Sequence, residues 1–301
     1  MMRRKCYSLL LPGGQKLVLG RRTLVMGIVN VTPDSFADGG CFLEPSRAAD
    51  HALALQEAGA DLLDIGGEST RPGSEAMTSS EELRRIVPVL EKLDGFVRVP
   101  LSVDTYKAAV ANVAIDHGVS MVNDVSALTY DADLARVVSE RGVPIVLMHN
   151  RGHSREMYRE ATYGNVTATV FNELQLAIKR AVVAGVPRSQ IVIDPGLGFA
   201  KRSRHSMAAL ANLVVLAGLD RPILVGPSRK SFLTAAIGDV GPSDREWATA
   251  GAVSSAVLSG AHIVRVHAVA EQADVVRTVD AIRSSSDGPS DPTGVRTCSL
   301  H

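Results

Sequence analysis

Three polar side chains stand at the ends of short apolar runs, at the positions where parallel strands would finish. Asp104 and Asp194 close two of these runs, and Asn123 lies at the end of a third. A buried carboxylate is costly unless it is paired or hydrogen-bonded, and helix capping or an ion pair would account for one such Asp alone. Three groups together suit a flat heterocycle with several N–H donors, because ionised Asp only accepts hydrogen bonds while Asn donates and accepts.

A basic group follows two later runs. Lys230 and Ser231 lie in the segment GPSRKS, between an apolar run and an expected helix whose first N–H groups form a natural anion site. A solvated surface loop is the plainer interpretation of this segment. Arg265 and His267 lie two positions apart at the end of the last run, and therefore on one side of the strand. With Lys230 nearby, they favour a bound anion or a planar ring stacked against Arg265.

Two loops rich in glycine and proline, residues 30–40 and 66–73, complete the set. They could be plain connectors, but their length and polar mixture indicate mobile lids over a pocket. Asn30 offers a neutral oxygen, which suits a Mg²⁺ ion held mainly by water and a pyrophosphate. His149 is expected to have a structural or loop role. The sequence contains no Gly-x-Ser-x-Gly motif and no Cys-x-x-Cys spacing, which argues against a covalent serine mechanism and a zinc site.

These side chains need a scaffold that brings strand ends together. Eight apolar runs, each followed by a helical stretch, predict a single-domain α/β fold of the (β/α)8 or TIM-barrel type, whose active site lies at the carboxyl ends of the strands. The expected strands are residues 23–30, 61–65, 99–103, 121–122, 144–148, 191–193, 223–225 and 263–266. Their nearly continuous Val, Ile and Leu content is typical of parallel strands covered on both faces. A doubly wound open sheet is the alternative, and it would also gather the strand ends.

The flanking segments are expected to be accessory. Residues 1–22 form an N-terminal extension, in which residues 16–22 look like a short β-hairpin or edge piece covering the barrel floor. The barrel domain is expected over residues 23–283, and the polar tail 284–301 is expected to be disordered. Within the barrel, Ser79 and Glu82 predict a capping box at a helix start, and Thr105 is expected to cap the next helix.

Composition narrows the class of protein further. The 301 residues contain 32 basic and 32 acidic side chains, so net charge offers no nucleic-acid or membrane surface. The apolar run near the N-terminus is too short for a signal-peptide core, and no run approaches the ~20 residues of a membrane span. We therefore expect a cytoplasmic protein that binds small molecules, without nucleic-acid or membrane partners.

Several strings resemble the dihydropteroate synthase family, and they occur in its order between residues 23 and 283. They are NVTPDSFADGG at 30–40, GGESTRPG at 66–73, SVDT at 102–105, Asn123 with Asp124, DPGLGFAK at 194–201, SRKS at 228–231 and RVH at 265–267. That family folds as the barrel described above, usually as a homodimer. It joins 6-hydroxymethyl-7,8-dihydropterin diphosphate to 4-aminobenzoate, with release of pyrophosphate, in folate synthesis.

The resemblance implies a role for each matching residue. The pterin would be held by Asp104, Asn123, Asp194 and Lys230, with Arg265 against its ring. Asn30 would bind Mg²⁺, while Arg265 and His267 would meet the pyrophosphate; the catalytic set would be Lys230, Arg265, His267 and Asp104. The aminobenzoate slot would be shaped by Phe36, Thr70, Arg71, Pro72, Phe199, Lys230 and Ser231.

The chain departs from the family pattern at positions that border the aminobenzoate slot. Ala200 and Thr234 stand where Gly is usual, which bears on sulfonamide affinity more than on activity. Two other functions share the pterin-binding residues: a methyltransferase module that works with a corrinoid partner, and a non-catalytic pterin-binding relative. The retained Asn30, Lys230 and Arg265, together with an expected pyrophosphate site, favour the synthase.

Overall fold

The chain folds as an eight-stranded parallel barrel. The computed structural model describes residues 4–31, 44–69, 74–152, 158–159 and 161–285. The barrel strands are β3 (Leu24–Asn30), β4 (Leu62–Gly66), β5 (Leu101–Asp104), β6 (Met121–Asp124), β7 (Ile145–Met148), β8 (Ile191–Asp194), β9 (Leu224–Val225) and β10 (Ile263–Val266). They pair in the order β8-β7-β6-β5-β4-β3-β10-β9, and a parallel bridge between Ile193 and Ile223 joins β8 to β9. The sheet therefore closes on itself, which confirms the barrel and rules out the open doubly wound sheet.

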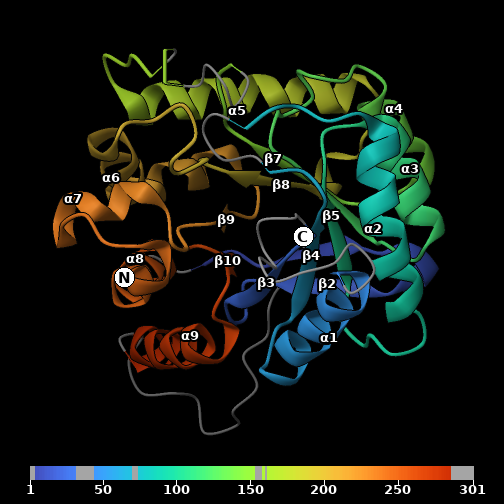
Figure 1. The fold of residues 1–301 in the computed structure, drawn as a ribbon. Coiled ribbons are helices and arrows are strands. Elements are labelled where there is room, and N and C mark those ends of the chain that lie inside the picture. The colour runs from blue at the N-terminus through green and yellow to red at the C-terminus, as the bar shows by residue number, and fades with distance from the viewer. Residues whose placement is uncertain (1–3, 32–43, 70–73, 153–157, 160, 286–301) are drawn as a thin grey trace, which may run out of the picture.

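Helices alternate with the strands and form a ring outside the barrel (Figure 1). They are α1 (Glu44–Glu57), α2 (Ser79–Leu93), α3 (Ala108–Asp116), α4 (Leu134–Arg141), α5 (Val166–Val183), α6 (Ser203–Ala211), α7 (Thr234–Ile237), α8 (Glu246–Leu258) and α9 (Val269–Ser285). Among the residues described, no helix is long and apolar enough to cross a bilayer.

Two of the predicted helix caps are wrong. Helix α2 is capped by Thr78, whose Oγ1 accepts a hydrogen bond from the Glu81 amide at 3.2 Å, so the true cap lies one residue before the predicted Ser79. Thr105 does not cap α3, because that helix begins at Ala108 with Lys107 as its N-cap. Thr105 instead accepts a bond from the Lys107 amide at 3.2 Å, which stabilises the turn ahead of the helix.

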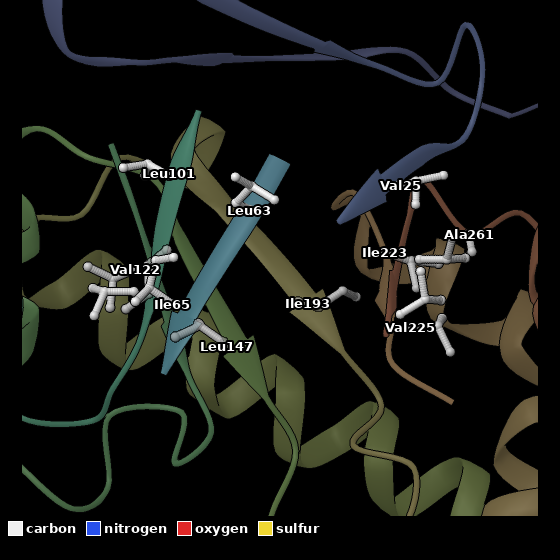
Figure 2. Close-up of a cluster of buried hydrophobic side chains, with 14 of the residues drawn as sticks. Val25, Leu63, Ile65, Leu101, Val122, Leu147, Ile193, Ile223, Val225 and Ala261 are labelled. Carbon is white, nitrogen blue, oxygen red and sulfur yellow. The ribbon is translucent and has the colours of Figure 1, made fainter. Parts of the chain in front are cut away.

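The apolar core has two shells, because successive residues of a strand face opposite sides of the sheet. The outer shell lies between strands and helices, and Figure 2 shows part of it, including Val25, Leu63, Ile65, Val122 and Ile193. The inner shell fills the barrel and contains Leu24, Met26, Leu62, Met121, Val146, Val192, Leu224 and Ile263. Strands that are buried on both faces in this way explain the continuous apolar runs of the sequence.

An N-terminal hairpin closes the floor of the barrel. Strands β1 (Tyr7–Leu10) and β2 (Lys16–Leu19) pair antiparallel, and Leu9 and Leu19 are fully buried in the inner shell. The predicted floor cover is thus confirmed, although its first strand begins well before residue 16. The hairpin blocks this end of the barrel interior, and the opposite mouth lies at the carboxyl ends of the strands. The predicted tail begins at residue 284, but residues 284 and 285 belong to α9, and residues 286–301 lie outside the described residues.

Candidate active site

The inward-facing positions become polar as the strands reach the mouth. Two residues beyond the inner-shell Leu62, Met121, Val192 and Ile263 stand Asp64, Asn123, Asp194 and Arg265. Asp104 joins them on β5, whose neighbouring residues Leu101 and Val103 face outward. The strand alternation that packs the core therefore also places these polar groups in one ring.

Arg265 lies at the centre of this ring, with two carboxylates on its guanidinium. Its Nε donates to Asp64 Oδ2 at 2.6 Å, and its Nη2 donates to Asp104 Oδ2 at 2.7 Å. The Asn123 Nδ2 donates to the same Asp64 oxygen at 2.9 Å. Burial raises the pKa of Asp104 to about 7; the positive charge of Arg265 opposes this shift and the negative charge of Asp64 adds to it. Four strands, β4, β5, β6 and β10, thus contribute to one buried charge network.

Three oxygens of this network keep spare capacity for hydrogen bonds. Asp64 Oδ1, Asp104 Oδ1 and Ser102 Oγ are buried and have no partner within the described part of the chain. Buried polar atoms are normally satisfied, so the unpartnered oxygens of Asp104 and Ser102 at the mouth of the barrel point to a ligand. Such a ligand must supply N–H or O–H donors, since a carboxylate oxygen can only accept.

Asp194 and Lys230 form the opposite wall. Asp194 Oδ1 accepts a bond from the Gly196 amide at 2.7 Å. Burial raises the pKa of Asp194, whereas the nearby Lys230 lowers it. Burial also lowers the pKa of Lys230 to about 8, and its ammonium lies 4.6 Å from the centre of the Phe199 ring. The wall therefore combines an acceptor, a cation and an aromatic face.

The loops after β9 and β10 meet at Ser228 and His267. Ser228 Oγ lies 2.9 Å from His267 Nδ1 and accepts a bond from the His267 amide at 3.2 Å. The helix expected at Ser231 is in fact a three-residue 3-10 turn, Ser231–Leu233, followed by the short α7. A turn of this length has little helix dipole, so the predicted anion site depends on side chains rather than on a helix start.

Asn30 ends β3 at the same edge of the barrel and pairs with Gly66 of β4. It is half-buried and offers a single neutral oxygen. No group of three or more His, Cys, Asp or Glu side chains suited to a metal occurs in the described ranges. A divalent ion here would therefore take most of its ligands from water and from a bound phosphate group.

Sequence reasoning missed two features. The first is Asp64, whose signal was a charged residue at an inward position of an otherwise apolar strand. The second is Lys201, a buried side chain whose Nζ lies 2.7 Å from His149 Nδ1 and donates to the Gly196 and Phe199 carbonyls at 3.1 Å. Burial lowers the pKa of His149 to about 4, and that ring also bonds Glu173 at 2.8 Å.

The contacts of His149 with Lys201 and Glu173 form a second network, which gives the end of β7 a structural role that the sequence did not assign. Lys201 ties the segment that carries Gly196 and Phe199 to the His149 backbone and ring. The loop after β8, which follows Asp194 and carries Phe199 into the wall of the site, is therefore anchored from β7. His149 has the structural role that the sequence led us to expect.

The site residues expected from the sequence divide into two groups. Asp104, Asn123 and Arg265 are in direct contact or share a partner, while Asp194, Phe199 and Lys230 form the facing wall. Asn30, Ser231 and His267 lie on the adjoining strand ends and loops. Phe36, Thr70, Arg71 and Pro72 lie outside the described residues, so their predicted roles remain predictions.

The chain is similar to proteins named as dihydropteroate synthases. Residues 26–267 match the family described as pterin binding enzyme. A dihydropteroate synthase of Bacillus subtilis is 42% identical over 87% of this chain and 89% of its own length. A Xanthomonas albilineans dihydropteroate synthase with 4-aminobenzoic acid has a TM-score of 0.87 at 41% identity, covering 93% of this chain and 99% of that one. Another, in complex with 7,8-dihydropteroate, has a TM-score of 0.77 at 36% identity, covering 88% and 94%.

A closed barrel whose mouth gathers carboxylates, an amide and cations is the architecture of the pterin-binding enzymes. The chain belongs to the dihydropteroate synthase family of these enzymes. It is accordingly a transferase.

Proposed function

We propose that the mouth of the barrel condenses 6-hydroxymethyl-7,8-dihydropterin diphosphate with 4-aminobenzoate to give 7,8-dihydropteroate and pyrophosphate. One observation carries this proposal: Arg265 is fixed between Asp64 and Asp104, beside the buried oxygens Asp104 Oδ1 and Ser102 Oγ, which have no partner among the described residues. A flat ring rich in N–H groups satisfies those acceptors and can stack on the guanidinium. Related enzymes in complex with 4-aminobenzoic acid and with 7,8-dihydropteroate support the proposed second substrate and the proposed product.

The pterin would lie between the two walls of the site. Asp104 and Asp194 would accept its ring N–H groups, and Asn123 would contribute its remaining amide hydrogen and its oxygen. Lys230 would donate to a ring acceptor, since its lysine ammonium has three donors and no acceptor. The buried position of these groups strengthens each hydrogen bond, because little water competes for it.

The reaction breaks the bond between the pterin methylene carbon and the diphosphate oxygen, and the electron pair leaves with pyrophosphate. The lone pair of the aniline nitrogen forms the new carbon–nitrogen bond, and the acidic anilinium proton then leaves to water or to the pyrophosphate. The residues provide hydrogen bonds and positive charge where negative charge develops: Arg265 and His267 would face the departing diphosphate. No strong general base is needed, because the attacking aniline nitrogen is neutral and carries a free lone pair.

Mg²⁺ would assist this step from the side of the diphosphate, with Asn30 as its protein ligand. When bound, the ion would neutralise part of the charge on the leaving group. The donor set fits this role, because one neutral oxygen suits an ion that arrives with its phosphate ligands rather than a resident ion. The direct check is calorimetry of Mg²⁺ in the presence of pyrophosphate, with Asn30→Ala losing the binding that the unmodified chain retains.

The aminobenzoate would bind next to the pterin, in a slot formed by Phe199, Lys230 and Ser231 and by the loops with Phe36, Thr70, Arg71 and Pro72. The stacking of Lys230 on Phe199 supports this placement, because it gives the slot an apolar face beside a cation. Its carboxylate would meet Ser231 at the turn after β9.

A methyltransferase that works with a corrinoid partner would use the same pterin carboxylates. It would have no need of cations at the diphosphate end of the pterin. The pair Ser228 and His267, together with Arg265, therefore favours transfer from a diphosphate ester.

The test is release of pyrophosphate from the pterin diphosphate, measured with and without 4-aminobenzoate and Mg²⁺. We expect release only when all three are present. Well-folded protein that releases no pyrophosphate under these conditions would refute the proposed reaction.

We also propose that the enzyme is a cytoplasmic homodimer that pairs through α8. Trp247 and Leu258 of this helix are 90% and 40% exposed, which leaves an apolar surface in the described structure. Light scattering should give twice the chain mass for the wild type and the single chain mass for Trp247→Glu. A wild-type chain that scatters as a monomer at working concentrations would rule out the dimer.

A further inference from the structure

Asp64 is the most enclosed charged group of the site. Its side chain has no solvent exposure, and it lies on β4 between the strands that carry Asn123 and Arg265. One oxygen, Oδ2, accepts both the Asn123 Nδ2 bond at 2.9 Å and the Arg265 Nε bond at 2.6 Å. Asp64 is therefore the common partner of two residues to which the proposed function gives contact with the pterin.

The bond to Asp64 decides which way the Asn123 amide faces. An ionised carboxylate can only accept, so it must meet the Nδ2 group of Asn123 and not the oxygen. A flipped amide would place two oxygens against each other in a buried site. Asp64 therefore holds the amide oxygen and the second amide hydrogen of Asn123 in fixed positions, which sets the pattern of acceptor and donor that a ligand meets.

The same carboxylate fixes the plane of Arg265. The guanidinium is planar, and it is bonded at Nε to Asp64 and at Nη2 to Asp104. Two contacts on one planar group leave it no rotation about its long axis. The face of Arg265 against which a ring can stack is thus held before any ligand arrives.

We propose that Asp64 is a positioning residue that orients the Asn123 amide and the Arg265 guanidinium for pterin recognition. This inference rests on the proposed function, because it assigns Asp64 a part in the same binding event. Asp64 acts through the two residues it holds.

The negative charge of Asp64 affects the pH dependence of pterin binding, which a merely structural role of Asp64 would leave unchanged. Asp104 faces Arg265, Asp64, Glu82 and Lys230, and among these Asp64 and Glu82 raise its pKa while the two cations lower it. Ionised Asp104 is the form that accepts a pterin N–H, so affinity should fall as the pH drops through about 7, the pKa of this carboxyl group. Removing the charge of Asp64 lowers the pKa of Asp104, which moves this fall in affinity to lower pH.

The experiment measures binding of 6-hydroxymethyl-7,8-dihydropterin by calorimetry between about pH 5 and pH 8.5, a range that brackets the Asp104 transition. Asp64→Ala removes the acceptor, whereas Asp64→Asn keeps one oxygen for both donors, removes the charge and replaces the second oxygen, Oδ1, by an NH2 group. Asp61→Asn is the matched control, because Asp61 also bonds an arginine, Arg22, but on the floor side of the barrel next to β2.

Asp64→Ala should weaken binding about 10- to 100-fold at the alkaline end, where Asp104 is ionised, since two buried donors lose their acceptor. Asp64→Asn should bind within about 3-fold of the wild type at the alkaline end, where Asp104 is ionised, with its acidic fall displaced to lower pH. Asp61→Asn should match the wild type in both respects. If Asp64→Ala does not fold, the displaced pH profile of Asp64→Asn carries the test.

Two results would overturn the role of Asp64 and leave the proposed function intact, provided that the wild type binds the dihydropterin. In the first, Asp64→Ala binds the dihydropterin as tightly as the wild type. In the second, the affinity of Asp64→Asn falls over the same pH range as that of the wild type. An Asp64→Asn as weak as Asp64→Ala at alkaline pH would also overturn this role, because charge rather than orientation would then be responsible. A wild-type chain that binds no dihydropterin would overturn the proposed function and this inference with it.

Discussion

Gly196 is the point at which two parts of the site come closest. It follows Asp194 in the loop after β8 and has a left-handed backbone, with φ +65°. A Cβ atom at this position would lie 2.0 Å from the carbonyl oxygen of His149. Because that carbonyl belongs to the backbone at the end of β7, it cannot rotate away. Gly196→Ala should therefore disrupt the loop that presents Asp194.

The expected cost has three parts. A left-handed alanine costs about 1 kcal/mol relative to glycine. The loop must also move to relieve the overlap, which costs roughly 1–3 kcal/mol more, as is typical of over-packed interiors. Displacement also weakens the bond from the Gly196 amide to Asp194 Oδ1, at 2.7 Å, and a hydrogen bond to a charged group contributes about 1.5–3 kcal/mol. The sum is about 3.5–7 kcal/mol, a large part of the stability of an ordinary domain.

Urea unfolding followed by circular dichroism measures the loss in the free energy of unfolding. Alanine substitutions at two other glycines separate the parts of this loss. Gly118 also has a positive φ, +88°, but has no atom within 4 Å of its Cβ position, so Gly118→Ala should lose only about 1 kcal/mol. Gly251 lies in α8 with open space around it, and Gly251→Ala should gain up to about 1 kcal/mol.

The difference between Gly196→Ala and Gly118→Ala isolates the overlap and the lost hydrogen bond. If the two variants unfold at the same urea concentration, the close approach to His149 does not constrain the loop and the reasoning is refuted. Where Gly196→Ala remains folded, its affinity for the dihydropterin should fall at least about 10-fold, since Asp194 is displaced.

Three further changes test other parts of the site. Arg265→Lys keeps the charge but cannot bridge Asp64 and Asp104, and it should weaken dihydropterin binding at least about 10-fold by calorimetry; unchanged affinity would show that the planar fork is unnecessary. Ser228→Ala removes both contacts with His267, so the KM for the pterin diphosphate should rise while the affinity for the dihydropterin alone stays the same. Ala200 is buried with φ +46°, and Ala200→Gly should raise the free energy of unfolding by about 0.5–1 kcal/mol; a decrease would mean that the backbone there is unstrained.

The sequence predicted the barrel well because its signal is repeated. Eight apolar runs with helical stretches between them leave few alternatives, and most predicted strands agree with the structure to within one or two residues. Helix starts were harder to place. Thr78 and Ser79 are both good capping residues, and only the backbone geometry decides that Thr78 is the cap of α2.

The site was predictable where a residue ends a strand and hidden where it lies within one. Asp104 and Asp194 attract notice because charge follows an apolar run, whereas Asp64 is enclosed by Leu63 and Ile65 and looks like part of strand β4. The partner of Lys201 was equally hidden, because His149 and Lys201 come from loops 52 positions apart that meet only in the closed barrel. Such pairs depend on the register of the sheet, which no local pattern specifies.

Formation of 7,8-dihydropteroate, detected by mass spectrometry, tests the central claim most directly. Incubation of the wild-type chain with the pterin diphosphate, 4-aminobenzoate and Mg²⁺ should give dihydropteroate and pyrophosphate in equal amounts. Asp194→Ala, which removes an acceptor from the proposed pterin site, should give neither above the rate without enzyme. Product from Asp194→Ala at the wild-type rate, or none from the folded wild type, would contradict a pterin-binding synthase at the mouth of this barrel.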